Sequence, residues 1–398
     1  MELTNKQQEG LRIAVTKFRN REKYVVISGY AGSGKSTLVK FIIDALSDYG
    51  VDPELDVAYC APTGAAAEVL RKKGNPNAMT LHKLLFESVP LPNGNFLRKR
   101  VESLPYKVIV ADETSMTPKS MIDALLSYPM FVIFLGDNFQ LLQVDKNEAH
   151  DLLDHPDIFL DEIMRQAQES EIIRLSMDIR EGKPLSLMKG NEVQIFEKKD
   201  LNTGMLQWAD IILCATNNMR HGLNQQKRQL LGFEGDLQNN ETLIIKSNYW
   251  NDLDSNDSPL VNGSIVTVKN LFKNFVILPR KIQIPNRRID FLQCDLETAG
   301  GGVLTNFALD RNFLLNEIPC VPWKVEYQLG KMKKMCGDLL PKRATYGYAI
   351  TCHAAQGSEW ERVLAIEERF PFDRGEHSRW LYTSITRSSK KCVLIKNS

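Results

Sequence analysis

Short apolar runs alternate with amphipathic segments over the first part of the chain. Runs rich in β-branched residues predict strands at residues 23–28, 56–61, 107–111 and 130–135. Apolar positions at helical spacing predict helices at residues 5–20, after Lys35, at 64–72 and at 120–126. Strands and helices that alternate in this way are typical of a parallel sheet covered by helices. This part of the chain is therefore predicted to form an α/β domain.

Residues 86–106 interrupt the alternation. An Asn93-Gly94 pair lies there between two extended arms. An Asn-Gly pair flanked by extended residues is the strongest short-range signal for a β-hairpin. We therefore expect a hairpin inserted between two α/β units.

The predicted secondary structure changes twice along the rest of the chain. Residues 157–232 are interpreted as helical with one strand at 211–216. Residues 241–318 are rich in strand and turn signals and predict a small barrel-like insertion. Residues 343–398 return to the alternation of strand and helix, which predicts a second α/β domain around the insertion. The predicted boundaries are 1–156 for the first domain, 157–240 with 341–398 for the second, and 241–340 for the insertion.

Composition narrows the class of protein. Of the 398 residues, 43% are hydrophobic and 25% are charged, which excludes wholesale disorder. The longest apolar stretch, 130–135, is far shorter than the roughly 20 residues of a membrane helix. The first ten residues lack an apolar signal segment, and the seven cysteines show neither a CxxC pair nor zinc-type spacing. We expect free thiols in a reducing compartment, hence a cytoplasmic protein that spans no membrane.

The sharpest chemical signal is the segment GYAGSGKST, which follows an apolar strand and matches the phosphate-loop pattern G-x-x-x-x-G-K-[ST]. Its glycines allow consecutive amides and a helix N-terminus to point at phosphate oxygens. Lys35 is expected to neutralise the β- and γ-phosphates, and the Ser36 hydroxyl to hold Mg²⁺. The residues expected to bind the nucleotide here are Gly29, Ala31, Gly32, Ser33, Gly34, Lys35, Ser36 and Thr37.

Two further strand ends carry polar residues suited to hydrolysis of a nucleoside triphosphate. Asp112 and Glu113 follow an apolar strand, along which neighbouring side chains point to different sides. We assign Asp112 to the Mg²⁺ shell and Glu113 to orienting and deprotonating the attacking water. Gln140 comes just after the next apolar strand, and its amide is suited to sense the γ-phosphate without titrating.

Further blocks follow in a fixed order over nearly the whole chain: APTGAAAEVL, TLHKLL, ADETSM, GDNFQLLQV, LDEIMRQ, VNGSIVTV, TCHAAQGSEW and YTSITR. Together with the phosphate loop they resemble superfamily 1B DNA helicases of the RecD-like and Dda-like group. The resemblance implies an α/β fold of two RecA-like P-loop domains with parallel sheets. It also implies a β-hairpin insertion in the first domain and a small SH3-like β-barrel insertion in the second.

The resemblance further implies an ATP-dependent DNA helicase that uses Mg²⁺ and moves 5′ to 3′ on single-stranded DNA. Its substrates would include junctions between single and double strands, and its protein partners would belong to replication or recombination. It would act as a monomer, and the Dda likeness implies a phage origin with activity in the cytoplasm of a bacterial host.

Individual site residues carry over from this family by their motifs. Gln7 in the block LTNKQ would read the adenine, and Arg165 and Arg387 would lie on the far side of the nucleotide. The family's fifth motif would place further residues at the cleft, namely Gln356, Gly357 and Glu359.

The same motifs match residues along single-stranded DNA in such helicases, namely Thr63, Thr80, His82 and His353. Outside the motif frame, a lone histidine is more often a satisfied structural residue. The net charge of +1 requires any polyanion to be bound by local patches. The basic runs at 71–73 and 98–100 are candidates, with a solvated surface as the alternative. Phe96 would either wedge a duplex fork with its aromatic face or pack the hairpin against its own domain.

Three other functions stay open from the residues. One is a single-stranded DNA translocase that displaces proteins without processive unwinding. Another is a P-loop NTPase switch or a nucleic-acid-binding module with little turnover, although no NKxD tetrad of a GTPase occurs. The third is a viral RNA motor of the same superfamily.

Overall fold

The computed structural model describes residues 3–90, 96–142, 146–163, 169–247, 249–253, 255, 259–278, 287–298, 300–321, 341–368 and 374–397. The chain divides into two compact units. The first comprises Met1–Leu85, Val101–Asn217 and Ile350–Ser398, and the second comprises Phe86–Arg100 and Asn218–Ala349. No helix in the described ranges is long and apolar enough to cross a membrane.

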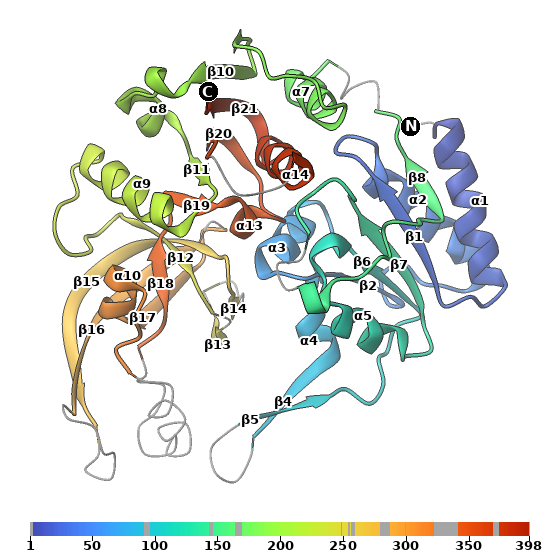
Figure 1. Cartoon of the computed structure of the whole chain (residues 1–398). Helices are drawn as coiled ribbons and strands as arrows, with labels where there is room; N and C mark the ends of the chain where they lie inside the picture. Colours follow the sequence, from blue (N-terminus) through green and yellow to red (C-terminus); the bar gives the residue numbers. More distant parts are fainter. Residues whose placement is uncertain are drawn as a thin grey trace. The chain divides into compact units, whose positions relative to one another are not determined.

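The first unit contains a parallel six-stranded sheet with the order β3-β2-β6-β7-β1-β8 (Figure 1). Its strands, in sheet order, are Met79–Thr80, Val57–Ala61, Val108–Ala111, Phe131–Gly136, Tyr24–Gly29 and Ile158–Leu160. The central strands β6 and β7 are buried at every residue. Strands buried on both faces read as continuous apolar runs, which is why the sequence located them. The predicted strands of this domain are confirmed with shifts of one residue at most ends.

Helices flank this sheet, and α1 and α2 share with it a core that includes Ala14, Leu38, Ile42, Val25 and Ile133. The capping box of Thr4 and Gln7 starts α1, because each side chain satisfies a backbone N–H of the other residue. The helices of this part are α1 Asn5–Arg19, α2 Lys35–Leu46, α3 Gly64–Lys72, α4 Leu81–Leu85 and α5 Lys119–Leu126, with the 3₁₀ turns Ser47–Tyr49, Thr114–Met116 and Lys146–Glu148.

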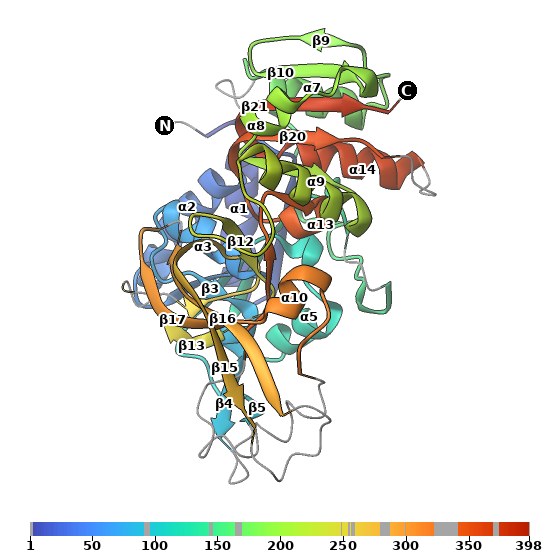
Figure 2. The same ribbon diagram turned by 90° about the vertical axis from the view of Figure 1, so that its left-hand side faces the viewer.

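The first unit also contains a second six-stranded sheet with the order β19-β11-β20-β21-β10-β9 (Figures 1 and 2). Its strands, in sheet order, are Ala349–Thr351, Ile211–Cys214, Trp360–Ile366, Ser388–Lys396, Val193–Glu197 and Met188–Lys189. β11, β20, β21 and β10 pair in parallel, and β9 is antiparallel at the edge. α7 Glu171–Arg180 and α14 Arg374–Ile385 contribute to its core. The remaining elements are α8 Thr203–Trp208, α13 Cys352–Ala355 and the 3₁₀ turn Lys198–Asp200.

The interpretation of residues 157–232 as helical with one strand is wrong. Besides β11, this range holds β8, β9 and β10. β8 pairs with β1 in the first sheet, and β10 pairs with β21 in the second. These short strands gain their hydrogen bonds from partners far away in the sequence, so the local pattern does not reveal them. The first sheet thus continues past residue 156, the predicted end of the first domain.

The second unit holds an antiparallel five-stranded sheet with the order β17-β16-β15-β12-β18. Its strands, in sheet order, are Val303–Leu309, Arg288–Thr298, Ile265–Ile277, Thr242–Ile245 and Ala344–Tyr346. An isolated bridge joins Leu309 to Lys342. The strand-rich insertion is therefore confirmed, while closure into an SH3-like barrel stays a prediction. The unit also contains β13 Tyr249–Leu253, β14 Pro259–Leu260, α10 Arg311–Asn316 and, apart from its first residue, α9 Asn217–Leu230.

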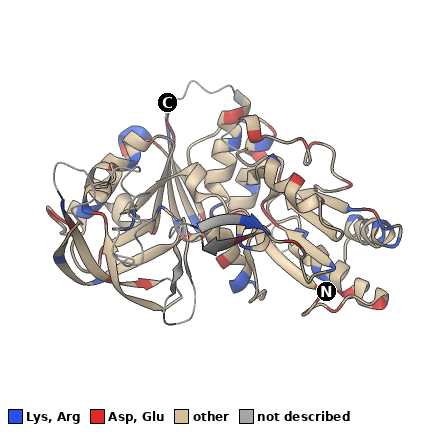
Figure 3. Cartoon of the chain, turned by 90° about the horizontal axis from the view of Figure 1, so that it is seen from below, with Lys and Arg blue, Asp and Glu red and all other residues tan. Residues whose placement is uncertain are grey.

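The predicted hairpin is present. β4 Phe86–Pro90 and β5 Phe96–Arg100 pair antiparallel, with Phe86 opposite Arg100 and Pro90 opposite Phe96. The Asn93-Gly94 turn and the Phe96 side chain lie outside what the structure describes. Basic and acidic residues are interspersed along the ribbon (Figure 3).

Candidate nucleotide-binding site

The phosphate loop joins the end of β1 to the start of α2. A Cβ on Gly29 would lie 2.7 Å from both Leu160 O and Ser33 Oγ, so only glycine fits there. Gly32 and Gly34 have φ of 76° and 81°, a left-handed conformation that glycine adopts at little cost. The loop therefore wraps back on itself, and the N-terminus of α2, whose amides have no helical partners, opens toward it.

Three polar side chains lie against this loop. Lys35 Nζ donates hydrogen bonds to Gly29 O and, at 3.1 Å, to Tyr30 O. Gln7 is buried, and its Nε2 donates to Gly34 O at 3.4 Å. Ser33 Oγ is buried and has no hydrogen-bond partner in the described ranges. Ser36 is exposed and Thr37 is half-buried at the start of α2. The structure thus places Gln7 beside the loop that the sequence identified.

Asp112 and Glu113 lie where β6 ends. Asp112 N donates to Cys60 O at 2.8 Å, which continues the pairing of β6 with β2. Asp112 Oδ1 accepts a hydrogen bond from Glu113 N at 2.8 Å. Glu113 has φ of 51°, and such a backbone conformation is sparsely populated by residues other than glycine and is concentrated at functional sites.

The environment of Glu113 brings together groups from both sheets. Burial raises the pKa of the Glu113 carboxyl above its ordinary value, and the nearby Arg387 guanidinium opposes this rise. Asp112 and Asp137 raise the same pKa, while Lys35 lowers it. A carboxylate with a raised pKa accepts a proton more readily near neutral pH, which suits a general base.

Arg387 follows α14 and is buried, with 7% of its surface exposed. Its Nε donates to Thr383 O at 3.2 Å, and its Nη1 donates to Ser358 O at 3.3 Å. The positive charge of Arg387 lowers the pKa of Glu113, which follows β6 of the first sheet. The structure thus brings together Lys35, Glu113 and Arg387 as the sequence predicts. Arg165, the other predicted arginine, lies outside the described residues.

The loop after β7 carries Gln140. This residue is buried, and its Oε1 has no hydrogen-bond partner in the described part of the chain. Arg379 of α14 donates to the backbone oxygens of Asn138 and Gln140. Thr383 Oγ1 accepts from Leu141 N at 2.9 Å. The buried amide oxygen is therefore available to a ligand, while α14 holds the backbone of the loop.

The fifth-motif residues divide into two groups. Gln356 Nε2 donates to Leu141 O at 2.6 Å. Gln356 therefore binds the loop after β7, to which Arg379 and Thr383 of α14 also bond. Gly357 has φ of 74°, and a Cβ there would lie 2.6 Å from Ala66 Cβ of α3. Glu359 is exposed, and its Oε2 lies 3.9 Å from Lys73 Nζ. The structure therefore does not place Glu359 with the buried cluster around Glu113.

The predicted DNA-contacting residues have local structural partners. Thr63 Oγ1 caps α3 by accepting from Ala66 N at 3.2 Å. Thr80 is buried, and its Oγ1 accepts from Lys83 N at 3.2 Å. His82 and His353 are half-buried. Burial lowers the pKa of His353, with Glu376 opposing the shift, so this imidazole is neutral at physiological pH. Their contacts with DNA stay a prediction, as does the role of Phe96.

Sequence reasoning missed several buried residues of the site. Asp137 is 1% exposed and accepts a hydrogen bond from the Tyr382 hydroxyl. Tyr382 lies inside the YTSITR block and Asp137 inside GDNFQ, so both motifs were recognised. Asp137 directly follows the buried strand β7, so the signal that located Asp112 and Glu113 also applies to it. Tyr382 lies in a helix, and no local signal marks it.

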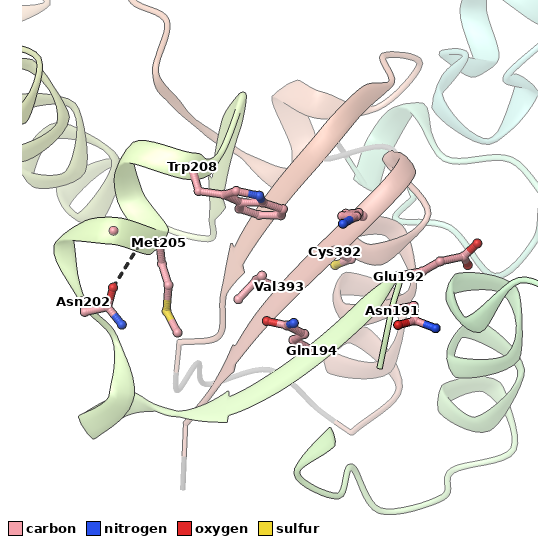
Figure 4. Close-up of a pocket in the computed structure, with 10 residues that line it drawn as sticks. Asn191, Glu192, Gln194, Asn202, Met205, Trp208, Cys392 and Val393 are labelled. Atoms are coloured by element: carbon pink, nitrogen blue, oxygen red, sulfur yellow. Dashed lines mark hydrogen bonds between the residues drawn. The ribbon is translucent and has the colours of Figure 1, made fainter. Parts of the chain in front are cut away.

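A separate cavity of about 290 Å³ lies between α8 and the strands β10 and β21 (Figure 4). Gln194, Trp208 and Val393 line it together with Asn202 and Met205. None of the predicted site residues lines this cavity. It is therefore distinct from the nucleotide site.

Comparisons with known proteins agree with this architecture. The family model of the AAA domain matches residues 2–200, half of the chain, and that of the UvrD-like helicase C-terminal domain matches residues 346–395. The chain is 32% identical over 193 residues to the ATP-dependent DNA helicase dda of Enterobacteria phage T4, covering 46% of this chain and 43% of the relative. It is 34% identical over 394 residues to the ATP-dependent RecD2 DNA helicase of Deinococcus radiodurans, covering 92% of this chain and 46% of the relative. The chain spans less than half the length of these curated relatives.

Solved structures of Pif1 helicases share the fold over the whole chain. A structure concerning DNA unwinding at forked double-stranded DNA by two Pif1 helicases matches with a TM-score of 0.58 and 19% identity, covering 100% of this chain and 92% of the other. The Candida albicans Pif1 helicase matches with a TM-score of 0.53 and 17% identity, covering 100% and 95%. The two parallel sheets of the first unit are typical of two RecA-like domains. The chain therefore belongs to the superfamily 1B helicases of the RecD and Dda type, with an AAA domain in its first half and a UvrD-like helicase C-terminal domain near its end.

Proposed function

We propose that this protein is an ATP-dependent DNA helicase that moves 5′ to 3′ on single-stranded DNA. One observation carries the proposal: the half-buried Glu113 lies close enough to Lys35 from the first sheet and to Arg387 from the second for both cations to lower its pKa. A triphosphate requires a cation beside its phosphates, a base for the attacking water and an arginine for the charge that develops on the transferred phosphoryl group. The two sheets together supply all three.

Hydrolysis follows from the positions of these groups. Glu113 accepts a proton from water, the water oxygen forms a bond to the γ-phosphorus, and the bond from that phosphorus to the β–γ bridging oxygen breaks. Lys35 and the amides of the phosphate loop bind the phosphate oxygens, and Arg387 neutralises charge on the γ-phosphoryl oxygens. Gln140 offers its unpartnered amide oxygen to the water, and Gln7 reads the adenine at the other end of the nucleotide.

The side chains at the loop fit Mg²⁺. No group of three or more His, Cys, Asp or Glu side chains that could hold a metal occurs in the described ranges. Mg²⁺ is commonly bound by one or two protein oxygens together with phosphates and water, rather than by an all-protein cage. The Ser36 hydroxyl and the Asp112 carboxylate are such oxygen donors. Bound there, Mg²⁺ would supply positive charge that stabilises the phosphates during transfer.

Movement along DNA depends on the two sheets closing and opening. Arg387 lies in the turn between α14 and β21 of the second sheet. ATP therefore favours the arrangement in which Arg387 faces Lys35 and Glu113, and hydrolysis removes this preference. Several solved relatives are described with single-stranded DNA, among them Bacteroides Pif1 in complex with ADP-AlF3 and ssDNA, at a TM-score of 0.55. In this chain, Thr63, Thr80, His82 and His353 would contact the strand.

The test compares ATP hydrolysis by the wild type and by Lys35→Ala, with and without single-stranded DNA. We expect hydrolysis stimulated by DNA in the wild type and lost in the variant. Lys40→Ala is the matched control, because Lys40 is an exposed lysine of the same helix. Duplexes with a 5′ or a 3′ single-stranded tail then test direction, and only the 5′-tailed duplex should open. Hydrolysis without opening of either duplex would contradict the helicase and favour a translocase.

A further inference from the structure

The Tyr382 hydroxyl joins two loops that come from the ends of different strands. It lies 2.9 Å from Ala31 N of the phosphate loop and 2.5 Å from Asp137 Oδ2 of the loop after β7. Tyr382 belongs to α14 of the second sheet's helical layer. A single side-chain atom of the second domain thus bonds to both nucleotide-site loops of the first.

The chemistry of the three groups sets the direction of both hydrogen bonds. The Ala31 N–H can only donate, and Asp137 Oδ2 accepts the hydrogen bond from the phenol. The phenol must therefore donate its proton to Asp137 and accept one from Ala31. Burial and the Asp137 charge raise the pKa of Tyr382, so the phenol keeps the proton that it donates. The hydrogen bonds from Ala31 N to the Tyr382 hydroxyl and from that hydroxyl to Asp137 therefore run in one direction only.

The ring and the hydroxyl of Tyr382 serve separable purposes. The ring packs edge-to-face on Phe139 with a centroid distance of 5.3 Å, and the whole residue has no exposed surface. Phenylalanine at this position would keep the aromatic contact and the burial. Only the two hydrogen bonds to Ala31 and Asp137 would be lost.

Other residues of α14 support the same connection. Thr383 and Arg379 bond to the backbone of residues 138–141, as described above. Arg387 follows the same helix and reaches Glu113. Tyr382 and Arg379 lie on α14, and Arg387 lies two residues after its end. The position of this helix therefore decides both where Arg387 lies and whether Ala31 N is held.

We propose that Tyr382 is a positioning residue that holds the phosphate loop in its nucleotide-binding conformation when the two RecA-like domains are docked. Its hydroxyl orients the Ala31 amide, and Asp137 orients the hydroxyl. The phosphate loop is therefore completed by the second domain and not by its own sheet alone. This inference rests on the proposed function, since it assumes that the loop binds the phosphates of ATP.

The first test is Tyr382→Phe, measured by steady-state ATP hydrolysis with saturating single-stranded DNA. A misoriented loop weakens binding of ATP and of the transition state alike, which raises KM more than it lowers kcat. Loss of a hydrogen bond to a charged group leads us to expect KM for ATP to rise about tenfold. We expect kcat to fall less than KM rises, because Arg387 and the ring packing are retained.

Ser384→Ala is the matched control. Ser384 is also a fully buried hydroxyl of α14, but it donates to Leu381 O within its own helix. Its loss should leave KM for ATP unchanged. The KM increases caused by Tyr382→Phe and Asp137→Asn should be less than additive in the double variant, because both residues act on the Ala31 amide through one chain of hydrogen bonds.

A measurement independent of catalysis is amide hydrogen exchange of the peptide that spans the phosphate loop. Tyr382→Phe should increase exchange there without nucleotide, and Ser384→Ala should not. Wild-type exchange and KM in Tyr382→Phe would overturn the inference, as would a lowered melting temperature with unchanged KM and exchange. Absence of ATP hydrolysis in the wild type would instead contradict the proposed function, and the exchange measurement would still decide the role of Tyr382.

Discussion

Replacement of Gly357 by alanine tests whether the two RecA-like domains meet in solution as they do in the structure. Gly357 has φ of 74°, and a Cβ built there lies 2.6 Å from Ala66 Cβ and 3.4 Å from Thr63 Oγ1. Two carbon atoms without a bond prefer a separation of about 3.5–4.0 Å. The alanine methyl group therefore cannot be accommodated unless α3 and the residues after α13 move apart.

The expected cost has two parts. Holding alanine in the left-handed conformation costs about 1–2 kcal/mol. Forcing a methyl group into a packed contact typically costs about 1–3 kcal/mol more. Part of this second cost is avoided if the domains separate, and then Arg387 moves away from Glu113 and ATP hydrolysis falls. We expect Gly357→Ala both to lower stability and to reduce kcat.

Two companion variants separate the backbone cost from the packing cost. Gly182 has φ of 71°, and a Cβ there meets nothing within 4 Å, so Gly182→Ala bears the backbone cost alone. Ala66→Gly removes the methyl group that Gly357→Ala would strike. Urea denaturation followed by tryptophan fluorescence, together with ATP hydrolysis, should rank Gly357→Ala as the most damaged variant. The double variant of Gly357→Ala with Ala66→Gly should recover kcat and approach the stability of Gly182→Ala.

The reasoning would be refuted by equal stability losses in Gly357→Ala and Gly182→Ala with wild-type kcat in both. It would also fail if Ala66→Gly did not improve the Gly357→Ala variant. Either result would mean that Gly357 and Ala66 do not approach each other in solution.

Two further predictions concern the charged residues Glu113 and Arg228. Glu113→Gln should abolish ATP hydrolysis while retaining nucleotide binding. Because burial raises the pKa of Glu113 in the folded chain from its ordinary 4.5, the native state loses stability as pH rises from about that value through the raised pKa. Glu113→Gln should therefore raise the melting temperature more at pH 8 than at pH 5, and an equal change at both would contradict a raised pKa of Glu113. Arg228 bonds to both Glu241 oxygens, at 2.6 and 2.8 Å, and Glu241 has no exposed surface. Arg228→Met should cost about 3–5 kcal/mol by leaving a buried carboxylate unpaired, far more than Arg362→Met, whose partner Asp210 is exposed. Comparable urea midpoints for the two variants would rule out that burial.

The sequence by itself determined the features that depend on a few neighbouring residues. The phosphate loop, the carboxylates after β6 and the Asn-Gly hairpin each follow from local backbone chemistry, so their positions were predicted closely. The apolar runs of β1, β6 and β7 predicted a parallel sheet, because strands that are buried on both faces have continuous apolar sequences. The short strands β8 and β10 were not predicted, because their partners lie far along the chain and their own few residues show no distinctive hydrophobic period.

Only the tertiary structure decided which distant groups meet. Tyr382 is 351 positions from Ala31 and 245 from Asp137, and no local pattern relates them. The pKa of Glu113 is likewise set by distant groups, since burial raises it and Arg387 from the other sheet lowers it. Local sequence motifs specify the local structure on which each side chain lies, because backbone preferences act over a few residues. Packing of the two sheets specifies their partners and their charges, because burial and Coulomb interactions act through space and not along the chain.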